Sequence, residues 1–181
     1  QKVKKLIVVD HHGTNKEAAA SAQEGLFALD HSGSVLTWQF FHKKTAIPKL
    51  LLLIEDVDLW KFTLPETKHI SMSLSLVPRE FEAWNAYAEL LEDERNLHKE
   101  DEKGRYLLLF SDKEIAVVAR EAEEVTFEGY KVLMVNAPII FASTMGHLLA
   151  KKQGPFALVW SRKAGQYKVS LRSDGSVNVA D

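Results

Sequence analysis

The chain has 181 residues, 46% apolar and 27% charged, which is typical of one or two globular domains with a hydrophobic core. A net charge of −2 excludes a broad basic surface for duplex nucleic acid but leaves room for a local pocket for a small anion. The absence of cysteine excludes disulfides and thiolate chemistry and fits the reducing cytoplasm, where we expect the protein. No apolar run approaches the roughly 20 residues that cross a bilayer.

The first predicted element is a strand. Leu6–Val9 form a short apolar, β-branched run, which predicts a strand buried on both faces in a parallel sheet. The run ends in Asp10, His11 and His12. Open α/β sheets bind ligands just beyond the carboxyl ends of their strands, so three metal-competent side chains stand where ligand sites form. The Asp10 carboxylate could fix the tautomer of a neighbouring imidazole that binds a cation. The alternative is a polar strand end with solvated histidines.

Three helices are predicted next. The first spans Glu17–Leu29, and the second follows the turn Ser32-Gly33-Ser34, in which either serine can cap the helix. The small residues of this turn would let a phosphate approach the helix amides, although a plain cap and turn is the commoner alternative. The third helix covers Lys49–Ile54 and begins after a proline.

The third helix leads into an acidic turn. Glu55, Asp56 and Asp58 place three carboxylates within four residues, a candidate site for a divalent cation. Solvated charge is the alternative. The apolar residues that follow, Trp60 and Phe62 among them, indicate that this turn lies beside a core.

A long connector helix is predicted over residues 78–103. Ile70–Leu76, which precedes it, fits a strand or an amphipathic helix equally well. In the connector, apolar residues recur every three or four positions. This stripe consists of Phe81, Trp84, Tyr87 and Leu91. The charged segment that follows ends at Gly104, where we expect a domain boundary.

After Gly104 the periodicity indicates a small mixed sheet with one helix. Strands are expected at Tyr106–Phe110, Ile115–Ala119, Tyr130–Val135, Phe156–Trp160 and Tyr167–Leu171. A helix is expected at Ile139–Lys152, with Gly154-Pro155 as its stop. The turn residues 173–176 predict that Val177–Val179 fold back as a hairpin.

Together these segments carry a resemblance to a known family. Asp10-His11-His12 after a strand matches the naming motif of the DHH phosphoesterases. The segment from Asp30 to Trp38, followed by 55–62, is similar to the later part of that family's catalytic domain. The segments 156–160 and 169–173 resemble its associated C-terminal substrate-binding domain. The resemblance implies an α/β protein with the C-terminal part of a parallel-sheet DHH domain (1–77), a connector helix (78–103) and an incomplete mixed α/β DHH-associated domain (104–181).

The resemblance also implies chemistry. Members of the family use two divalent cations, commonly Mn²⁺, to hydrolyse phosphodiester or phosphoanhydride bonds in short oligonucleotides and related small phosphate esters. By resemblance, His11 is a metal ligand, His12 faces the phosphate and Asp10 orients the pair. Asp56 completes one metal shell, with Asp58 as its rival. Mg²⁺ is the alternative cation.

The same resemblance assigns substrate contacts to the C-terminal segment. By resemblance, Arg172 and Ser173 bind the terminal phosphate or sugar of the substrate. Arginine suits this role because its planar guanidinium can bind a phosphate through two parallel hydrogen bonds. A surface cation beside a turn is the alternative for Arg172.

Some family motifs are missing from this chain. The family's first metal motifs precede its Asp-His-His motif, and a glycine-rich loop ending in histidine follows near its C-terminus. One histidine and one aspartate are too few for two cations that need about three or four ligands each. We therefore expect an inactive piece of a longer phosphodiesterase.

Two other classes of function remain open. One is a non-catalytic nucleotide- or RNA-binding module, because the C-terminal domain type also occurs as an RNA-contacting part of other enzymes. The other is a structural piece that forms a homodimer through the stripe containing Trp84.

Overall fold

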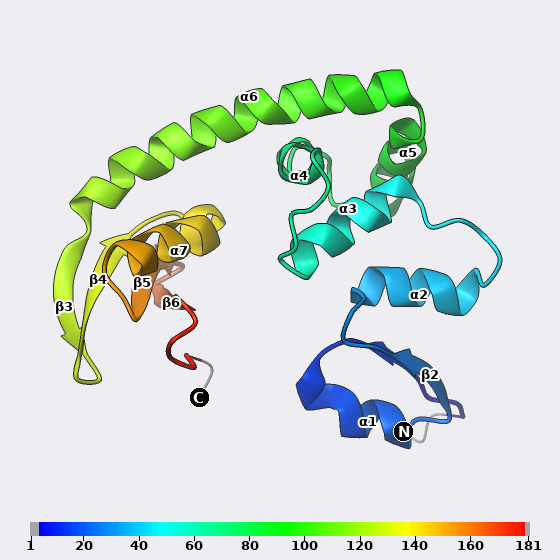
Figure 1. Ribbon diagram of the computed structural model, residues 1–181, viewed down its shortest axis with the longest axis horizontal. Helices are drawn as coiled ribbons and strands as arrows, with labels where there is room; N and C mark the ends of the chain where they lie inside the picture. The colour runs from blue at the N-terminus through cyan, green and yellow to red at the C-terminus, as the bar shows by residue number, and fades with distance from the viewer. Residues whose placement is uncertain (1–3, 180–181) are drawn as a thin grey trace. The chain divides into compact units, whose positions relative to one another are not determined.

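The computed structural model describes residues 4–179 and is a mixed α/β protein. It divides into two compact units, Gln1–Leu108 (unit 1) and Leu109–Asp181 (unit 2). Helix α6 (Glu94–Val118) is the long helix of Figure 1. It contributes Leu97 to the core of unit 1 and Ile115 to the core of unit 2. Within residues 4–179, no helix is long and apolar enough to span a membrane.

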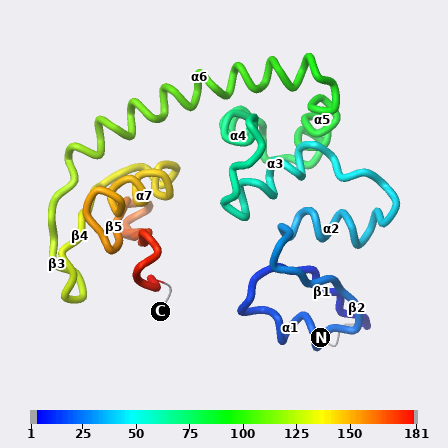
Figure 2. The backbone as a smooth tube through the Cα atoms, in the orientation of Figure 1, coloured from blue at the N-terminus to red at the C-terminus, as the bar shows by residue number. Residues whose placement is uncertain are grey.

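Unit 1 begins with two parallel strands, β1 (Ile7–Asp10) and β2 (Glu24–Phe27), which Figure 2 traces side by side. Gly25 of β2 lies against the backbone of β1, because a Cβ atom there would stand 1.9 Å from the carbonyl oxygen of Val8. The expected burial of β1 on both faces is wrong, since Ile7 is 38% exposed and Val8 only half-buried in this two-stranded sheet.

The connection between the two strands is shorter than the sequence predicts. It consists of the 3₁₀ turn η1 (Gly13–Asn15) and α1 (Lys16–Ser21). The predicted helix Glu17–Leu29 is therefore wrong beyond Ser21, because the segment that contains Gly25 pairs with β1 as a strand. In this segment, pairing with β1 outweighs the local helix propensity.

Four helices complete the first part of unit 1. They are α2 (Gly33–Phe41), α3 (Lys49–Asp58), α4 (Thr67–Leu74) and α5 (Phe81–Leu91). The apolar faces of α3, α4 and α5 meet in one core, made of Leu50, Leu53, Ile70, Tyr87 and Leu91 together with Leu97 of α6. Helix α2 buries Val35 and Leu36 outside this core.

Three predictions for the segments that form these helices can be compared with the structure. The acidic residues 55–58 do not form a turn after the helix, as predicted, but belong to the C-terminal end of α3. The segment that fitted either a strand or a helix lies in the helix α4 and the turn after it. The predicted apolar stripe of α5 is buried only in part, because Phe81 at its start is 81% exposed.

The predicted connector consists of two helices, α5 and α6. The chain turns at Glu92 and Asp93, and Asp93 Oδ1 caps α6 by accepting hydrogen bonds from the amides of Arg95 and Asn96, both at 3.0 Å. Helix α6 then continues without a break through Gly104. Gly104 allows close packing, because a Cβ atom there would lie 1.8 Å from the carbonyl oxygen of His69 in α4.

The two strands expected directly after Gly104 are wrong. Tyr106–Phe110 lies within α6, and Ile115–Ala119 forms its end and the start of η2 (Ala119–Glu121). Short apolar runs do not distinguish a strand from a buried helix segment by periodicity alone. Here an established helix continues through them, because each added residue gains a hydrogen bond without a new nucleus.

Unit 2 is a four-stranded sheet with one helix. Its elements are β3 (Glu123–Phe127), β4 (Tyr130–Asn136), η3 (Ile139–Phe141), α7 (Ala142–Lys152), β5 (Phe156–Lys163) and β6 (Gln166–Ser173). The strand order is β3-β4-β5-β6, with β4 and β5 parallel across the α7 crossover and both outer pairs antiparallel.

The core of unit 2 lies where α7 packs against the sheet, with Met145 and Leu149 fully buried beside Val135 and Val159. Sequence periodicity predicted β4, β5 and β6 within a few residues but missed β3. The hairpin expected at Val177–Val179 is wrong, since these described residues form no strand.

Candidate metal and phosphate site

Asp10, the last residue of β1, organises the strand end. Its Oδ1 accepts hydrogen bonds from the backbone amides of His11 (2.7 Å) and His12 (3.0 Å), and its Oδ2 accepts one from Asn15 Nδ2 (2.7 Å). The bonds from the backbone and side chain of His12, with that from Asn15, hold the pKa of Asp10 far below its usual value. Asp10 is therefore a carboxylate at neutral pH and fixes the turn that carries both histidines.

His12 is oriented by this carboxylate. His12 Nδ1 donates to Asp10 Oδ1 at 2.8 Å, because an ionised carboxylate can only accept. This bond leaves the other ring nitrogen, Nε2, available to bind a ligand. The His12 side chain is largely exposed. Histidine ligands of metals are commonly held by a carboxylate in this way.

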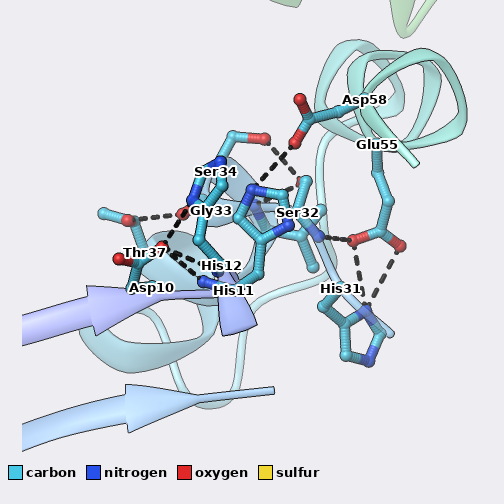
Figure 3. Close-up of polar contacts among 11 residues, drawn as sticks. Asp10, His11, His12, His31, Ser32, Gly33, Ser34, Thr37, Glu55 and Asp58 are labelled. Atoms are coloured by element: carbon cyan, nitrogen blue, oxygen red, sulfur yellow. Dashed lines mark hydrogen bonds and ion pairs between the residues drawn. The ribbon is translucent and has the colours of Figure 1, made fainter. Parts of the chain in front are cut away.

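His11 faces α3. Its Nε2 lies 3.3 Å from Asp58 Oδ2, and a dashed line marks this ion pair in Figure 3. The His11 side chain is 14% exposed, whereas Asp58 is 46% exposed. The two histidine rings are neighbours, with centroids 4.3 Å apart and planes tilted by 58°.

We call Asp10, His11, His12 and Asp58 the strand-end cluster. Ligand atoms of its first three members all lie within 4.8 Å of one another. Two donor atoms that bind one cation at about 2.1 Å each, at right or tetrahedral angles, lie about 3.0–3.4 Å apart. The 3.3 Å between His11 Nε2 and Asp58 Oδ2 falls in that range, which is also the range of a direct ion pair between the two side chains.

Asp56 does not join this cluster. It is 4% exposed, and its carboxylate accepts four hydrogen bonds from the loop after α3 and from α4. The donors are the amide of Thr63 (2.9 Å), Thr63 Oγ1 (2.7 Å), the amide of Leu64 (3.1 Å) and Thr67 Oγ1 (2.5 Å). We call this group the Asp56 hub.

The fold therefore uses the whole carboxylate of Asp56. Burial by itself would raise its pKa, but the hydrogen bonds from Thr67, Thr63 and Leu64 outweigh burial and lower the pKa to about 2. The structure places the rival, Asp58, at His11, whereas protein donors bond to both carboxylate oxygens of Asp56. The metal role of Asp56 stays a prediction. The helical phase explains the difference, since Asp56 and Asp58 are two residues apart on α3 and residues two apart do not share a face.

The N-terminus of α2 lies beside the same cluster. Ser32, one of the two serines that the sequence offers as a cap, caps α2 by accepting a hydrogen bond from the amide of Val35 (3.2 Å). Gly33, the first helical residue, borders the His11 ring, because a Cβ atom there would stand 3.9 Å from His11 Cδ2. Helix N-termini favour anions through their free amides and dipole, so a phosphate could lie here next to the cluster.

Glu55 and His31 hold this helix end in place, a role that the sequence analysis missed. Glu55 Oε2 accepts hydrogen bonds from the Ser32 amide (2.7 Å) and from His31 Nδ1 (3.1 Å). Glu55 and Asp58 lie three residues apart on α3, so both reach toward α2 and β1 (Figure 3). Helical spacing through Asp58 is the sequence signal that would have paired them.

Arg172 and Ser173, the predicted substrate contacts, lie on β6 of unit 2. Arg172 Nη1 donates to the Leu171 carbonyl (2.8 Å) and Nη2 to Ser143 Oγ of α7 (3.0 Å). Gly146 makes room for this side chain, because a Cβ atom there would stand 2.6 Å from Arg172 Cγ. Ser173 Oγ accepts from the Gly175 amide (2.9 Å). Their contacts with substrate stay predictions.

The known proteins that match this chain have no described activity. No family model matches the sequence. The chain is 27% identical over 159 residues to an uncharacterized protein of Acanthamoeba polyphaga mimivirus, a match that covers 86% of this chain and 38% of the viral protein. The chain thus spans well under half the length of this relative. An uncharacterized protein from Helicobacter pylori matches in structure with a TM-score of 0.36 and 18% identity, over 92% of this chain and 59% of that one.

Proposed function

We propose that unit 1 binds a divalent cation between His11 and Asp58 and belongs to a DHH-type phosphoesterase. The substrates we propose are short oligonucleotides or related small phosphate esters, with Mn²⁺ as the cation and Mg²⁺ as the alternative. The observation that carries this proposal is the ligand-like spacing of His11 Nε2 and Asp58 Oδ2, 3.3 Å apart, beside a histidine held by a carboxylate. The match of Asp10-His11-His12 to the family's naming motif supports the same reaction class.

Each residue of the strand-end cluster would have a separate role in the proposed reaction. A cation bound here would polarise a phosphoryl oxygen and lower the pKa of a bound water. His11 and Asp58 would hold it, while the exposed Nε2 of His12 would face the phosphate. Asp10, which is ionised at neutral pH, keeps His12 in one tautomer. The α2 N-terminus beside His11 would attract the phosphate oxygens.

The number of ligands limits what this chain does alone. Within residues 4–179, one group of at least three clustered metal-ligating side chains is found, at Asp10, His11 and His12. Two cations need about three or four protein ligands each. We therefore propose that these 181 residues bind one cation and do not form a two-metal centre unaided.

Titration calorimetry with Mn²⁺ tests the proposal without relying on activity. We expect the 181-residue chain to bind about one Mn²⁺ and His11→Ala to lose that binding. The matched control is His98→Ala, because His98 is an exposed histidine of α6 outside the cluster. A wild-type chain that binds no Mn²⁺, or a His11→Ala chain that binds it as tightly, would contradict the cation site.

Hydrolysis is tested on a longer protein that contains this chain. We expect Mn²⁺-dependent cleavage of di- to pentanucleotides that His12→Ala abolishes. A longer protein that binds Mn²⁺ at the strand-end cluster yet leaves all these substrates intact would separate cation binding from the proposed reaction and refute the latter.

A further inference from the structure

Helix α6 exposes a row of apolar side chains to solvent. Tyr106, Leu109 and Phe110 are at least 59% exposed, and Val117 is 49% exposed. Their spacing along α6 is helical, so they share one face of the helix. We define these four residues as the α6 stripe. An apolar patch on a protein surface often marks a site of interaction, and no role described so far uses this one.

The α6 stripe lies on the opposite side of the helix from the cores of both units. Leu97 and Ile115 belong to these cores, and Gly104 packs closely against α4. With about 3.6 residues per turn, these three positions share one side of α6, and the stripe lies on the other. Neither core therefore covers the stripe.

The two edges of the stripe carry charges in a self-complementary order. Arg105 and Asp112 lie along one edge. Lys103 and Glu114 lie along the other. On each edge the cation precedes the carboxylate, and both pairs are centred on the same point of α6, midway between residues 108 and 109. One twofold axis at this point therefore brings each cation to the level of the carboxylate on the same edge of a second α6.

This order favours a second copy of α6 that runs in the antiparallel direction. In an antiparallel pair of helices, like edges face each other, so Arg105 meets Asp112 of the second copy. Lys103 meets Glu114 on the other edge in the same register. In a parallel pair, opposite edges face each other, and Arg105 would lie beside Lys103 of the second copy. Because like charges repel at such distances, the parallel pair is disfavoured.

The present partners of these two cations hold them weakly. Lys103 Nζ lies 3.0 Å from Glu100, and an Arg105 nitrogen lies 3.9 Å from Glu102, each about one turn away on the same helix. Pairs made by exposed cations contribute little to stability. Glu100 also keeps a hydrogen bond from the Tyr87 hydroxyl (3.2 Å). Both cations can therefore exchange these contacts for a carboxylate of a second copy.

We propose that α6 forms an antiparallel dimer with α6 of a second copy of this chain, about a twofold axis beside Leu109. Twofold dimers are the commonest homo-oligomers, and their interfaces are self-complementary, as this face of α6 is. Leu109 meets its own copy at the axis, and Tyr106 packs against Phe110 of the second copy. The interface contains no residue of the strand-end cluster, so its test is independent of the proposed function.

The area of the stripe indicates a weak dimer. An aromatic side chain has about 150–250 Å² of surface, so the exposed parts of the four side chains amount to roughly 400 Å² per copy. With the flanking charged residues, two copies bury on the order of 1,000 Å², the low end of specific interfaces. We expect a dissociation constant on the order of 10–100 µM.

Sedimentation velocity of the full 181-residue chain in EDTA, over a concentration series, tests the dimer. We expect a monomer–dimer equilibrium that Leu109→Glu weakens about tenfold or more, because this change places two carboxylates together at the axis. A chain that stays monomeric up to about 500 µM, well above the expected dissociation constant, would overturn the proposal.

The matched control is Phe81→Glu. Phe81 is a more exposed aromatic residue and lies on the apolar stripe of α5, the alternative surface for a homodimer. We expect Phe81→Glu to associate as the wild type does. A loss of dimer in Phe81→Glu that equals or exceeds the loss in Leu109→Glu would overturn the proposal.

A charge swap tests the direction and register of the pair. Arg105→Glu should weaken the dimer about tenfold at low salt, since two exposed ion pairs become two contacts between carboxylates. Adding Asp112→Arg restores opposite charges on that edge and should restore the wild-type affinity. Both positions are exposed, so the variants should melt within a few degrees of the wild type. Stronger association in Arg105→Glu, or a double variant as weak as the single one, would refute the antiparallel pair.

Discussion

Unit 1 contains two carboxylate-centred groups that the fold treats in opposite ways. In the Asp56 hub, four donors saturate a buried carboxylate. In the strand-end cluster, Asp58 is half-exposed and faces an imidazole, and His12 keeps a nitrogen for a ligand. The two aspartates are only two residues apart on α3. Helical phase therefore decides which carboxylate stabilises the chain and which can bind a ligand.

The largest expected effect comes from removing the hub. Asp56→Ala leaves the Thr63 and Leu64 amides and two threonine hydroxyls without their acceptor, and hydrogen bonds to charged groups are worth about 1.5–3 kcal/mol each. We expect the free energy of unfolding to fall by about 3 kcal/mol or more in urea titrations.

The loop that the hub holds adds to this cost. Trp60 and Phe62 have positive φ (55° and 50°), a conformation that non-glycine residues adopt only when their surroundings enforce it. Asp58→Ala is the control, because an exposed carboxylate contributes little, and we expect a change below about 1 kcal/mol. Equal destabilisation by the two variants would contradict the stabilising role of the Asp56 hub relative to the strand-end cluster.

The second effect is a dependence of stability on pH. The pKa of Asp56 is about 2 in the folded protein and near 3.8 when the group is free. A lowered pKa stabilises the fold fully above pH 3.8, and this contribution is lost as pH falls toward 2. We expect it to be on the order of 2 kcal/mol.

Urea titrations between pH 7 and pH 2 measure this loss. The comparison is with Asp56→Asn, which cannot titrate at this position. Asp10 and Glu100, whose pKa values are also lowered, remain in both proteins, so the difference between the two curves isolates Asp56. Parallel curves would show that the Asp56 charge does not stabilise the fold.

Both the fold and the site were predictable where the signal is local. The Asp10-His11-His12 strand end, the Ser32 cap of α2 and the strands β4 to β6 each follow from a short run of residues. The predictions were wrong where contacts with distant or preceding parts of the chain determine the secondary structure. Gly25 suits a close approach between backbones that no sequence window shows, and the apolar run 106–110 continues a helix already formed.

The carboxylate partner of His11 could not be chosen from residue types alone. Asp56 and Asp58 are the same residue type two positions apart, and the choice between them depends on how far α3 extends. With the helix reaching Asp58, Glu55 and Asp58 share the face toward β1 and α2, and Asp56 turns toward Thr67. The length of one helix therefore fixes the composition of the candidate site.

The smallest of the three effects tests that choice directly. If Asp58 is a cation ligand, Asp58→Asn should weaken Mn²⁺ binding about tenfold or more, or about 1.4 kcal/mol, because an amide oxygen replaces a charged one. Thermal unfolding should change little, since Asp58 lies outside the Asp56 hub. Asp56→Asn should show the reverse pattern, with a lower melting temperature and unchanged Mn²⁺ affinity at temperatures where the chain stays folded. Loss of Mn²⁺ affinity in Asp56→Asn alone would assign the metal role to Asp56 and refute the choice of Asp58.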